Sequence, residues 1–549
     1  MTEPLAAGPT DAGRRLLRSS VVVGIGTGAS RVTGLLRTIA IAYALGTLLV
    51  GDSYNLANTT PNVVYDLVLG GILAATLVPI IVDRFEHDDQ RSVDALATVV
   101  TLALLVLTVL ATALAPVIIR LYTIGKDPVE AEQQISLAVP LLLMFMPQVF
   151  FYGLSTLWTA VLNAKRSFAV PAFAPVLNNV MVIALFLALP QLIDGELTVD
   201  TLLDDTPLLL LVGLGTTAGI AAMALVLWPA MRRAGIRLHW NPDWRNPAVG
   251  TVARLSAWTL GYVAANQVVF FVMITLVNGT GVGRVSAFTY AWQFFQLPYG
   301  LFTVSIMTTF TPELATHVAR SDLTAYRRRF AQGLRLGALV VIPTAVAYLV
   351  LAGPMVSVLL EYGQFDDASA DLTSFALRWL AVGLPGFAAF LYSMRGFYAF
   401  KDTRTPFFLN MFENGFQIVL SFALLPFFGF GGVIAAFSIG YTVAAAVSLV
   451  TLQRRAGRLG DRDLGLAVVR HLVAAAGMGL ALLGVVSFVS RDLLALLVGV
   501  VVGGLVYLGV LVLLRSPDLV ELRHQLRRSP AGAVGGPPTG RESDQAPLP

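Results

Sequence analysis

The chain has 549 residues, of which 56% are hydrophobic and only 13% are charged, with a formal net charge of +4. A soluble domain cannot bury that many apolar side chains, so the composition indicates an integral membrane protein. The small net charge gives no sign of a nucleic-acid-binding surface. Because the chain has no cysteine, disulfides, thiolate metal sites and cysteine nucleophiles are excluded, and five scattered histidines favour no metal cluster.

Apolar runs recur along the chain with no polar stretch long enough for a separate soluble domain. A membrane-spanning helix needs roughly 20 mostly apolar residues. Cutting the runs at their polar breaks predicts fourteen spans, the first a retained helix rather than a signal peptide. The division within 405–452 is placed near Gly429 to Gly432. In chain order the spans are 20–48, 54–82, 93–121, 133–162, 170–191, 206–230, 251–279, 285–315, 333–360, 372–399, 406–427, 430–452, 465–489 and 493–514.

Lysine and arginine are distributed unevenly over the predicted loops. The loops after even-numbered spans hold eighteen of them, and the loops after odd-numbered spans hold three, namely Lys126, Arg284 and Arg491. Basic loops stay in the cytoplasm. We therefore expect a multi-pass protein of the bacterial inner membrane with both termini in the cytoplasm, and a Gly- and Pro-rich tail from Ser529 that is disordered.

The chain also repeats itself. Pro116 and Pro354 stand in similar segments 238 residues apart, Pro147 and Pro385 have the same offset, and Lys165 matches Lys401 after a short gap. A repeat of six helices predicts two parallel lobes around a central cavity, followed by two further helices. The predicted division is an N-terminal tail 1–19, an N-lobe 20–230, a cytoplasmic linker 231–250, a C-lobe 251–452, two helices in 453–515 and a disordered cytoplasmic tail 516–549.

Two arginines stand inside the first span. A charge near mid-bilayer costs about 2.5–3.5 kcal/mol on insertion scales and is tolerated where it faces a wet cavity or a partner. Arg31 and Arg37 lie six residues apart, which separates them by about 9 Å along a helix. We expect them to line one broad cavity wall. The alternative is a structural role in which Asp52 or Asp66 neutralises them, or in which they snorkel.

Other polar groups within the predicted spans are candidates for a cavity or a gate. Asp66 is predicted to be a counter-ion of Arg31 or a protonatable gate. Arg395 and Glu413 are equally compatible with a functional role and with an ion pair between them. The amides include Asn62, Gln293 and Asn414. Singly such side chains are more often contacts between helices than ligands, but together they favour a wet interior between the lobes.

Several motifs resemble those of the MurJ/MviN family, the lipid II flippases of the multidrug/oligosaccharidyl-lipid/polysaccharide exporter superfamily. The resemblance covers roughly residues 20–515. The motifs are SRVTGLLR (30–37), TPN (60–62), LVP (77–79), YAWQFFQLPYG (290–300), LEYGQF (360–365) and FYAFKDTRTP (397–406).

The resemblance implies fourteen helices in two lobes and no enzymatic reaction. It also implies a cargo, undecaprenyl diphosphate bearing a peptidoglycan disaccharide-pentapeptide, and places Ser30, Arg31 and Arg37 at the cavity floor against the diphosphate. Asp52 matches a family acid at the start of the second helix. Where relatives carry further charges, this chain has Tyr65, Gly70, Trp292 and Gln293, and Arg395 is a candidate substitute.

The sequence thus predicts a flippase that works by alternating access for cell-wall synthesis, with membrane lipids and the cell-wall synthesis machinery as partners and no nucleic acid. No cofactor or metal is expected, while coupling to the membrane potential or to a cation is left open. The alternatives are a flippase for another polyprenyl-linked glycan and an ion-coupled exporter of small molecules. A membrane glycosyltransferase is least consistent with the short outer loops.

Overall fold

A computed structural model describes residues 11–66, 77–87, 89–193, 197–300, 304–459 and 462–519. Every regular element in these ranges is a helix, which confirms the all-α prediction. The first half contains α1 (Asp11–Leu45), α2 (Leu49–Tyr65), α3 (Leu77–Glu86), α4 (Gln90–Tyr122), α5 (Pro128–Phe145), α6 (Pro147–Ala164), α7 (Ala169–Ala188), η2 (Leu189–Gln191), α8 (Val199–Asp204), α9 (Thr206–Leu225) and α10 (Leu227–Arg233). The second half contains α11 (Pro247–Asn278), α12 (Arg284–Pro298), α13 (Val304–Ala319), α14 (Leu323–Leu360), α15 (Asp367–Ala399), α16 (Arg404–Ala456), α17 (Arg462–Phe488) and α18 (Asp492–Leu513).

Nine helices in the described ranges are long and apolar enough to span a membrane. One of them, α16, contains two predicted spans, and its backbone is non-helical at Gly429, where the sequence places their division. The count of fourteen spans stays a prediction. Helix α1 begins at Asp11, so the described part of the predicted tail 1–19 is helical. The tail from Ser529 lies outside the described residues.

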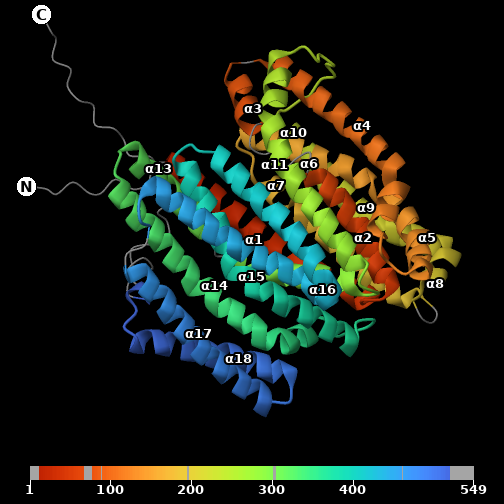
Figure 1. The fold of residues 1–549 in the computed structure, drawn as a ribbon. Helices are drawn as coiled ribbons and strands as arrows, with labels where there is room; N and C mark the ends of the chain where they lie inside the picture. Colours follow the sequence, from red (N-terminus) through yellow and green to blue (C-terminus); the bar gives the residue numbers. More distant parts are fainter. Residues whose placement is uncertain are drawn as a thin grey trace, which may run out of the picture.

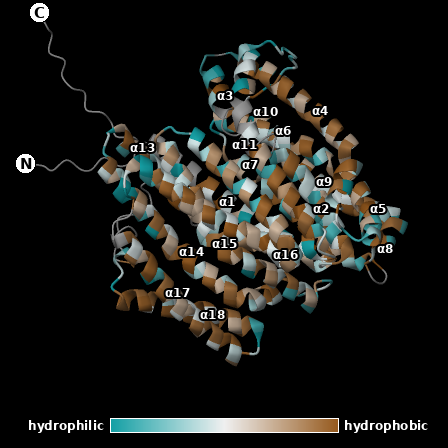
Figure 2. Cartoon of the chain, in the orientation of Figure 1, coloured by the Kyte–Doolittle hydropathy of each residue, from teal (hydrophilic) through white to brown (hydrophobic). Residues whose placement is uncertain are grey.

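The helices form two groups and a peripheral pair (Figure 1). In the first half, α1 packs against α7, α2 against α5, and α6 against α9; in the second, α15 packs between α14 and α16. The halves meet where α12 contacts α1 and α2 and where α11 contacts α4. Helices α17 and α18 pack on each other and on α14 at one edge of the molecule, where Figure 2 shows mostly hydrophobic residues.

The two halves share local backbone features that extend the sequence repeat. Asp89 caps α4 by accepting from the Ser92 amide, and Asp322 caps α14 by accepting from the Ala325 amide. Arg166 and Lys401 both adopt a positive φ, of 58° and 57°, directly after α6 and α15. This left-handed residue ends a helix by satisfying its last carbonyls. The structure therefore pairs Lys401 with Arg166, one residue along from the sequence match with Lys165.

A buried polar cluster fastens the C-terminal pair of helices to α14. The Asp518 carboxylate lies 3.1 Å from Nε of Arg335 and 3.3 Å from Nε2 of His471. His471 also bonds the Tyr507 hydroxyl at 3.0 Å, and that hydroxyl donates to the Leu339 carbonyl. Asp518 is fully buried, so the start of the predicted disordered tail 516–549 is in fact packed. Burial favours a raised Asp518 pKa, but the His471 hydrogen bond and the Arg335 charge outweigh it and hold the pKa below its usual range.

We expect Asp518→Asn to weaken the attachment of α17 and α18, because it removes the negative charge that pairs with the half-buried Arg335 and contacts the buried His471 ring. Breaking a buried ion pair costs about 3 kcal/mol. The Tm of the detergent-solubilised protein should therefore fall, whereas exposed Asp492→Asn should leave it nearly unchanged. Since the Asp518 pKa is lowered in the folded state, its stabilisation is present at neutral pH and is lost as the pH falls. The two proteins should accordingly converge in Tm at acidic pH, and a constant difference would contradict this role.

Candidate functional site

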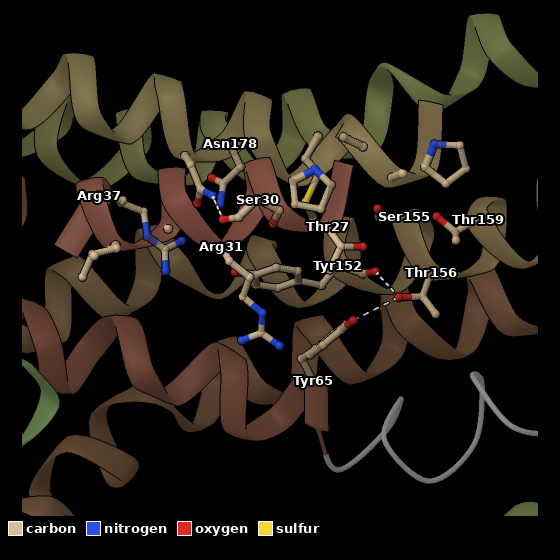
Figure 3. Close-up of a pocket in the computed structure, with 18 of the residues that line it drawn as sticks. Thr27, Ser30, Arg31, Arg37, Tyr65, Tyr152, Ser155, Thr156, Thr159 and Asn178 are labelled. Carbon is tan, nitrogen blue, oxygen red and sulfur yellow. Dashed lines mark hydrogen bonds between the residues drawn. The ribbon is translucent and has the colours of Figure 1, made fainter. Parts of the chain in front are cut away.

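A cavity of about 620 Å³ lies between α1, α6, α7 and α12. Figure 3 shows Arg31 and Arg37 projecting from α1 into this space, with the hydroxyl groups of Ser155, Thr156 and Thr159 lying at its other end. The described residues that line it include donors and acceptors of several kinds but no carboxylate. Two cations and a set of neutral polar groups therefore face a space of ligand size.

Contacts with α7 set the orientation of α1. Gly26 lies so close to Ala172 that a Cβ would clash with it. Asn179 donates from its side chain to the Ser30 carbonyl at 3.2 Å and to the Thr33 hydroxyl at 2.9 Å. These contacts hold one side of α1 against α7, which leaves the arginine side chains to point into the cavity. Ser30 itself lines the cavity, as expected from the sequence.

Neither arginine has an acidic partner among the residues that the structure describes. No carboxylate lies within 4.0 Å of Arg31 or Arg37 in those ranges, and Nε of Arg37 is buried without a hydrogen-bond partner. In the structure, therefore, neither Asp52 nor Asp66 neutralises these arginines. Apart from the buried Nε of Arg37, the guanidinium donors of both arginines therefore remain available for an anion.

A second cavity, of about 490 Å³, continues the first toward the C-terminal half. Arg37, Gln293 and Gln296 line both cavities, so the two spaces meet at these side chains. The second cavity brings together the other predicted candidates Asn62, Asp66, Gln293 and Asn414. Asp66 accepts a hydrogen bond from Gln267 at 3.3 Å and does not pair with Arg31.

Asp52 lies elsewhere. It is fully buried, and its carboxylate accepts from the backbone amides of Gly283 at 2.6 Å and Ser286 at 2.8 Å. These are orphan amides at the start of α12, and a carboxylate there also suits the helix dipole. Asp52 therefore joins α2 to α12 and lines neither cavity, which corrects its sequence-based placement with the cavity residues.

The turns around Asp52 close this end of the molecule. The amide of Gln364 donates to the Tyr43 carbonyl at 2.9 Å, and the hydroxyl groups of Thr47 and Ser369 lie 2.7 Å apart. Gly46 and Gly283 have positive φ and approach the opposing backbone too closely for a Cβ. Segments from both halves thus interlock at the end where α1 turns into α2.

Arg395 and Glu413 are not paired with each other. Arg395 is exposed, outside both cavities, with its guanidinium 5.8 Å from the centre of the Tyr398 ring. The Glu413 side chain is 0% exposed, and neither carboxylate oxygen has a hydrogen-bond partner in the described part of the chain. Of the two possibilities that the sequence left open, the ion pair does not form, because Arg395 is exposed and Glu413 is buried.

One wall of the cavity was not predicted from the sequence. Tyr152, Ser155, Thr156 and Thr159 line it from one side of α6, and Tyr65 reaches the Thr156 hydroxyl at 3.1 Å. Their spacing of three and four residues places them on one face of a helix. That periodicity is the sequence signal that could have found them.

Because the chain has no cysteine, single cysteines can report which positions reach water. We expect Thr27→Cys, on the cavity wall, and Asn62→Cys, in the second cavity, to react with a charged thiol reagent. Ser53→Cys should react at least about tenfold more slowly, because Ser53 is fully buried next to Asp52. Labelling rates of the detergent-solubilised protein measure this. Equal rates at all three positions would contradict a wet cavity and a closed end.

Comparison with known proteins gives a consistent result. The sequence profile of the family described as "Lipid II flippase MurJ" matches residues 41–502. The chain is 28% identical over 448 residues to the lipid II flippase MurJ of Burkholderia cenocepacia, covering 80% of this chain and 84% of that one. It is 27% identical over 492 residues to a probable lipid II flippase MurJ of Rhizobium meliloti, with 87% and 88% covered.

Solved structures show the same fold. A lipid II flippase MurJ in an inward closed conformation superposes with a TM-score of 0.73 at 20% identity, covering 92% of this chain and all of that one. An inward-facing multidrug resistance transporter of the MATE family superposes with a TM-score of 0.58 at 16% identity, covering 81% and 95%. Since the family profile matches most of its length, the chain belongs to the MurJ family, a family of membrane transporters rather than enzymes.

Proposed function

We propose that this chain moves lipid II, a polyprenyl diphosphate carrying the peptidoglycan building block, from the inner to the outer leaflet of the bacterial inner membrane. The observation that carries the proposal is a pair of arginines that, among the described residues, have no acidic partner and face a cavity with no lining carboxylate. The curated relatives bear the name of that activity. Both termini would then lie in the cytoplasm, as the distribution of basic loops predicts.

The chemistry of the cavity suits a diphosphate. Guanidinium groups form paired, charge-assisted hydrogen bonds with phosphate oxygens, and a partly desolvated site strengthens them. The hydroxyl side chains of α6 offer further donors to a sugar or peptide. A positively charged small molecule, in contrast, would meet two arginines and no acid in the first cavity.

The closed end suggests how transport proceeds. Asp52 ties α2 to α12, so the two halves are held together at this end. We infer that the halves separate there when the cargo leaves, which requires the carboxylate to release two backbone amides. Two lobes predicted from the sequence, 20–230 and 251–452, would then move relative to each other. Residues 231–250 would link them, and residues 453–515 would belong to neither lobe.

The central test is charge removal at the cavity. Each arginine hydrogen-bonded to a phosphate contributes about 1.5–3 kcal/mol, so Arg31→Ala or Arg37→Ala should weaken lipid II binding by at least about tenfold. Exposed Arg395→Ala, which lies outside both cavities, should bind as the unaltered protein does. Binding of lipid II to the purified protein and its transfer in vesicles measure the effect.

Several outcomes would contradict the proposal. Lipid II binding that survives the double variant Arg31→Ala/Arg37→Ala would show that these arginines do not hold the cargo. A preference for another polyprenyl diphosphate glycan over lipid II would change the cargo and leave the site assignment intact. Efflux of organic cations with no response to any diphosphate lipid would instead support the small-molecule exporter.

Glu413 bears on how transport is driven. An unpaired carboxylate in a dry site is strongly unfavourable, and such groups are neutralised or paired in proteins. We propose that the cycle is coupled to the binding and release of one positive charge, a proton or a monovalent metal ion, at Glu413. Asn410 and Asn414, which lie on α16 with Glu413, both donate to Asn266 on α11.

Glu413→Gln keeps the shape of the side chain and removes its charge. We expect the rate of lipid II transfer in vesicles to depend on pH or on sodium in the unaltered protein, and this dependence to be lost in the variant. Exposed Asp371→Asn serves as the control and should keep the dependence. The coupling assignment fails if Glu413→Gln responds to both ions as the unaltered protein does.

A further inference from the structure

A third cavity, of about 660 Å³, lies in the N-terminal half between α4, α6 and α10. It shares no lining residue with the two cavities described above. Helix α6 separates them: Phe150, Leu154 and Trp158 face the third cavity, whereas Tyr152, Thr156 and Thr159 face the first. The spacing of four residues in the first set places its members on one face of α6. This cavity is therefore a separate space.

The third cavity is basic. Arg232 and Arg237 line it, and none of the other described lining residues is acidic. Within the described ranges neither arginine has a carboxylate within 4.0 Å, and both are exposed. The Asp94 carboxylate is buried and bound to His239 instead. It accepts from the His239 amide at 3.1 Å and lies 3.2 Å from the ring nitrogen of the same residue. Two guanidinium groups are thus free for an external anion.

The segment that carries Arg237 is held in place along the start of α4. Gln90 donates to the Arg237 carbonyl at 3.3 Å, and the Asn241 amide donates to the Thr98 hydroxyl at 3.0 Å. Arg232 is positioned by a cation–π contact, 4.0 Å from the Trp228 ring. The two cations are therefore placed by the fold at the mouth of the cavity.

The surroundings of the cavity resemble a membrane interface. Trp228 is 47% exposed, and further along the chain Trp240 and Trp244 are exposed as well. Tryptophan gathers where hydrocarbon meets the headgroups. The outer face of α4 next to this end exposes apolar side chains, among them Leu105, Val106, Val109 and Leu110. An acyl chain could lie on that face while its headgroup reaches the arginines.

We propose that the third cavity binds the headgroup of an anionic phospholipid, with its phosphodiester between Arg232 and Arg237. Basic pockets between helices at the cytoplasmic side of a membrane commonly hold such headgroups. Phosphate suits the guanidinium fork, and the aromatic and apolar walls suit the glycerol and acyl portions. The proposal concerns a site on the far side of α6 and stands apart from the transported cargo.

Native mass spectrometry of the detergent-solubilised full chain tests this, with phosphatidylglycerol as the probe and phosphatidylcholine as the zwitterionic comparison. We expect Arg232→Gln/Arg237→Gln to reduce phosphatidylglycerol binding at least about fivefold. The matched control is Arg328→Gln/Arg454→Gln, two exposed arginines that line none of the cavities described here, and it should bind as the unaltered protein does. Thr101→Trp, which fills the cavity without changing charge, should also lose binding.

Four other outcomes would count against a phospholipid site in the third cavity. Equal loss in the control pair would indicate a general effect of charge. Phosphatidylcholine binding as tight as that of phosphatidylglycerol would remove the need for the arginines. Displacement of the lipid by millimolar inorganic phosphate would identify an anion site without lipid specificity. Loss of binding in Arg31→Ala would place the lipid in the transport cavity instead.

Discussion

A guanidinium group inside an apolar helix must meet water, an anion or a buried counter-charge, because its burial in hydrocarbon is costly. Arg31 and Arg37 impose this requirement on α1, and no acid within 4.0 Å of either satisfies it in the described ranges. The surrounding helices instead leave a polar cavity in front of both side chains. Three features agree with the need for a polar environment around both arginines. They are the hydroxyl face of α6, the amides Gln293 and Gln296, and the position of α1 against α7.

A cavity that holds cargo must be shut at one end if it is to transport. Here short polar contacts between backbone segments add to apolar packing across the two halves, in which Leu45, Phe288 and Phe365 belong to one buried cluster. Asp52 satisfies two amides at the start of α12, and the Gly46 and Gly283 turns let the opposing chains approach closely. Such contacts can be exchanged for water when the ends separate.

Much of the fold could be predicted because membrane helices are recognisable in a sequence by their length and hydrophobicity. The division of α16 at Gly429 was visible as a glycine cluster between two apolar runs. Asp52 was misplaced because its partners, Gly283 and Ser286, are backbone amides more than 200 residues away, and an amide leaves no mark in the sequence. Arg395 and Glu413 flank a short loop in the sequence and therefore look like an ion pair. Whether they meet depends on how α15 and α16 pack, and in the structure they do not. Tertiary contacts decided both cases.

The charges of cargo and carrier also constrain the energy source. In the proposed orientation a diphosphate with about two negative charges moves outward, away from a cell interior that is negative. A membrane potential supplies about 2.3 kcal/mol per charge per 100 mV, so this step is already downhill electrically. The empty carrier then has to return with Arg31 and Arg37 unpaired. A positive charge released from or bound at Glu413, in the other half of the molecule, would act on that return step. Coupling at Glu413 is therefore expected to change the rate of resetting more than the affinity for the cargo.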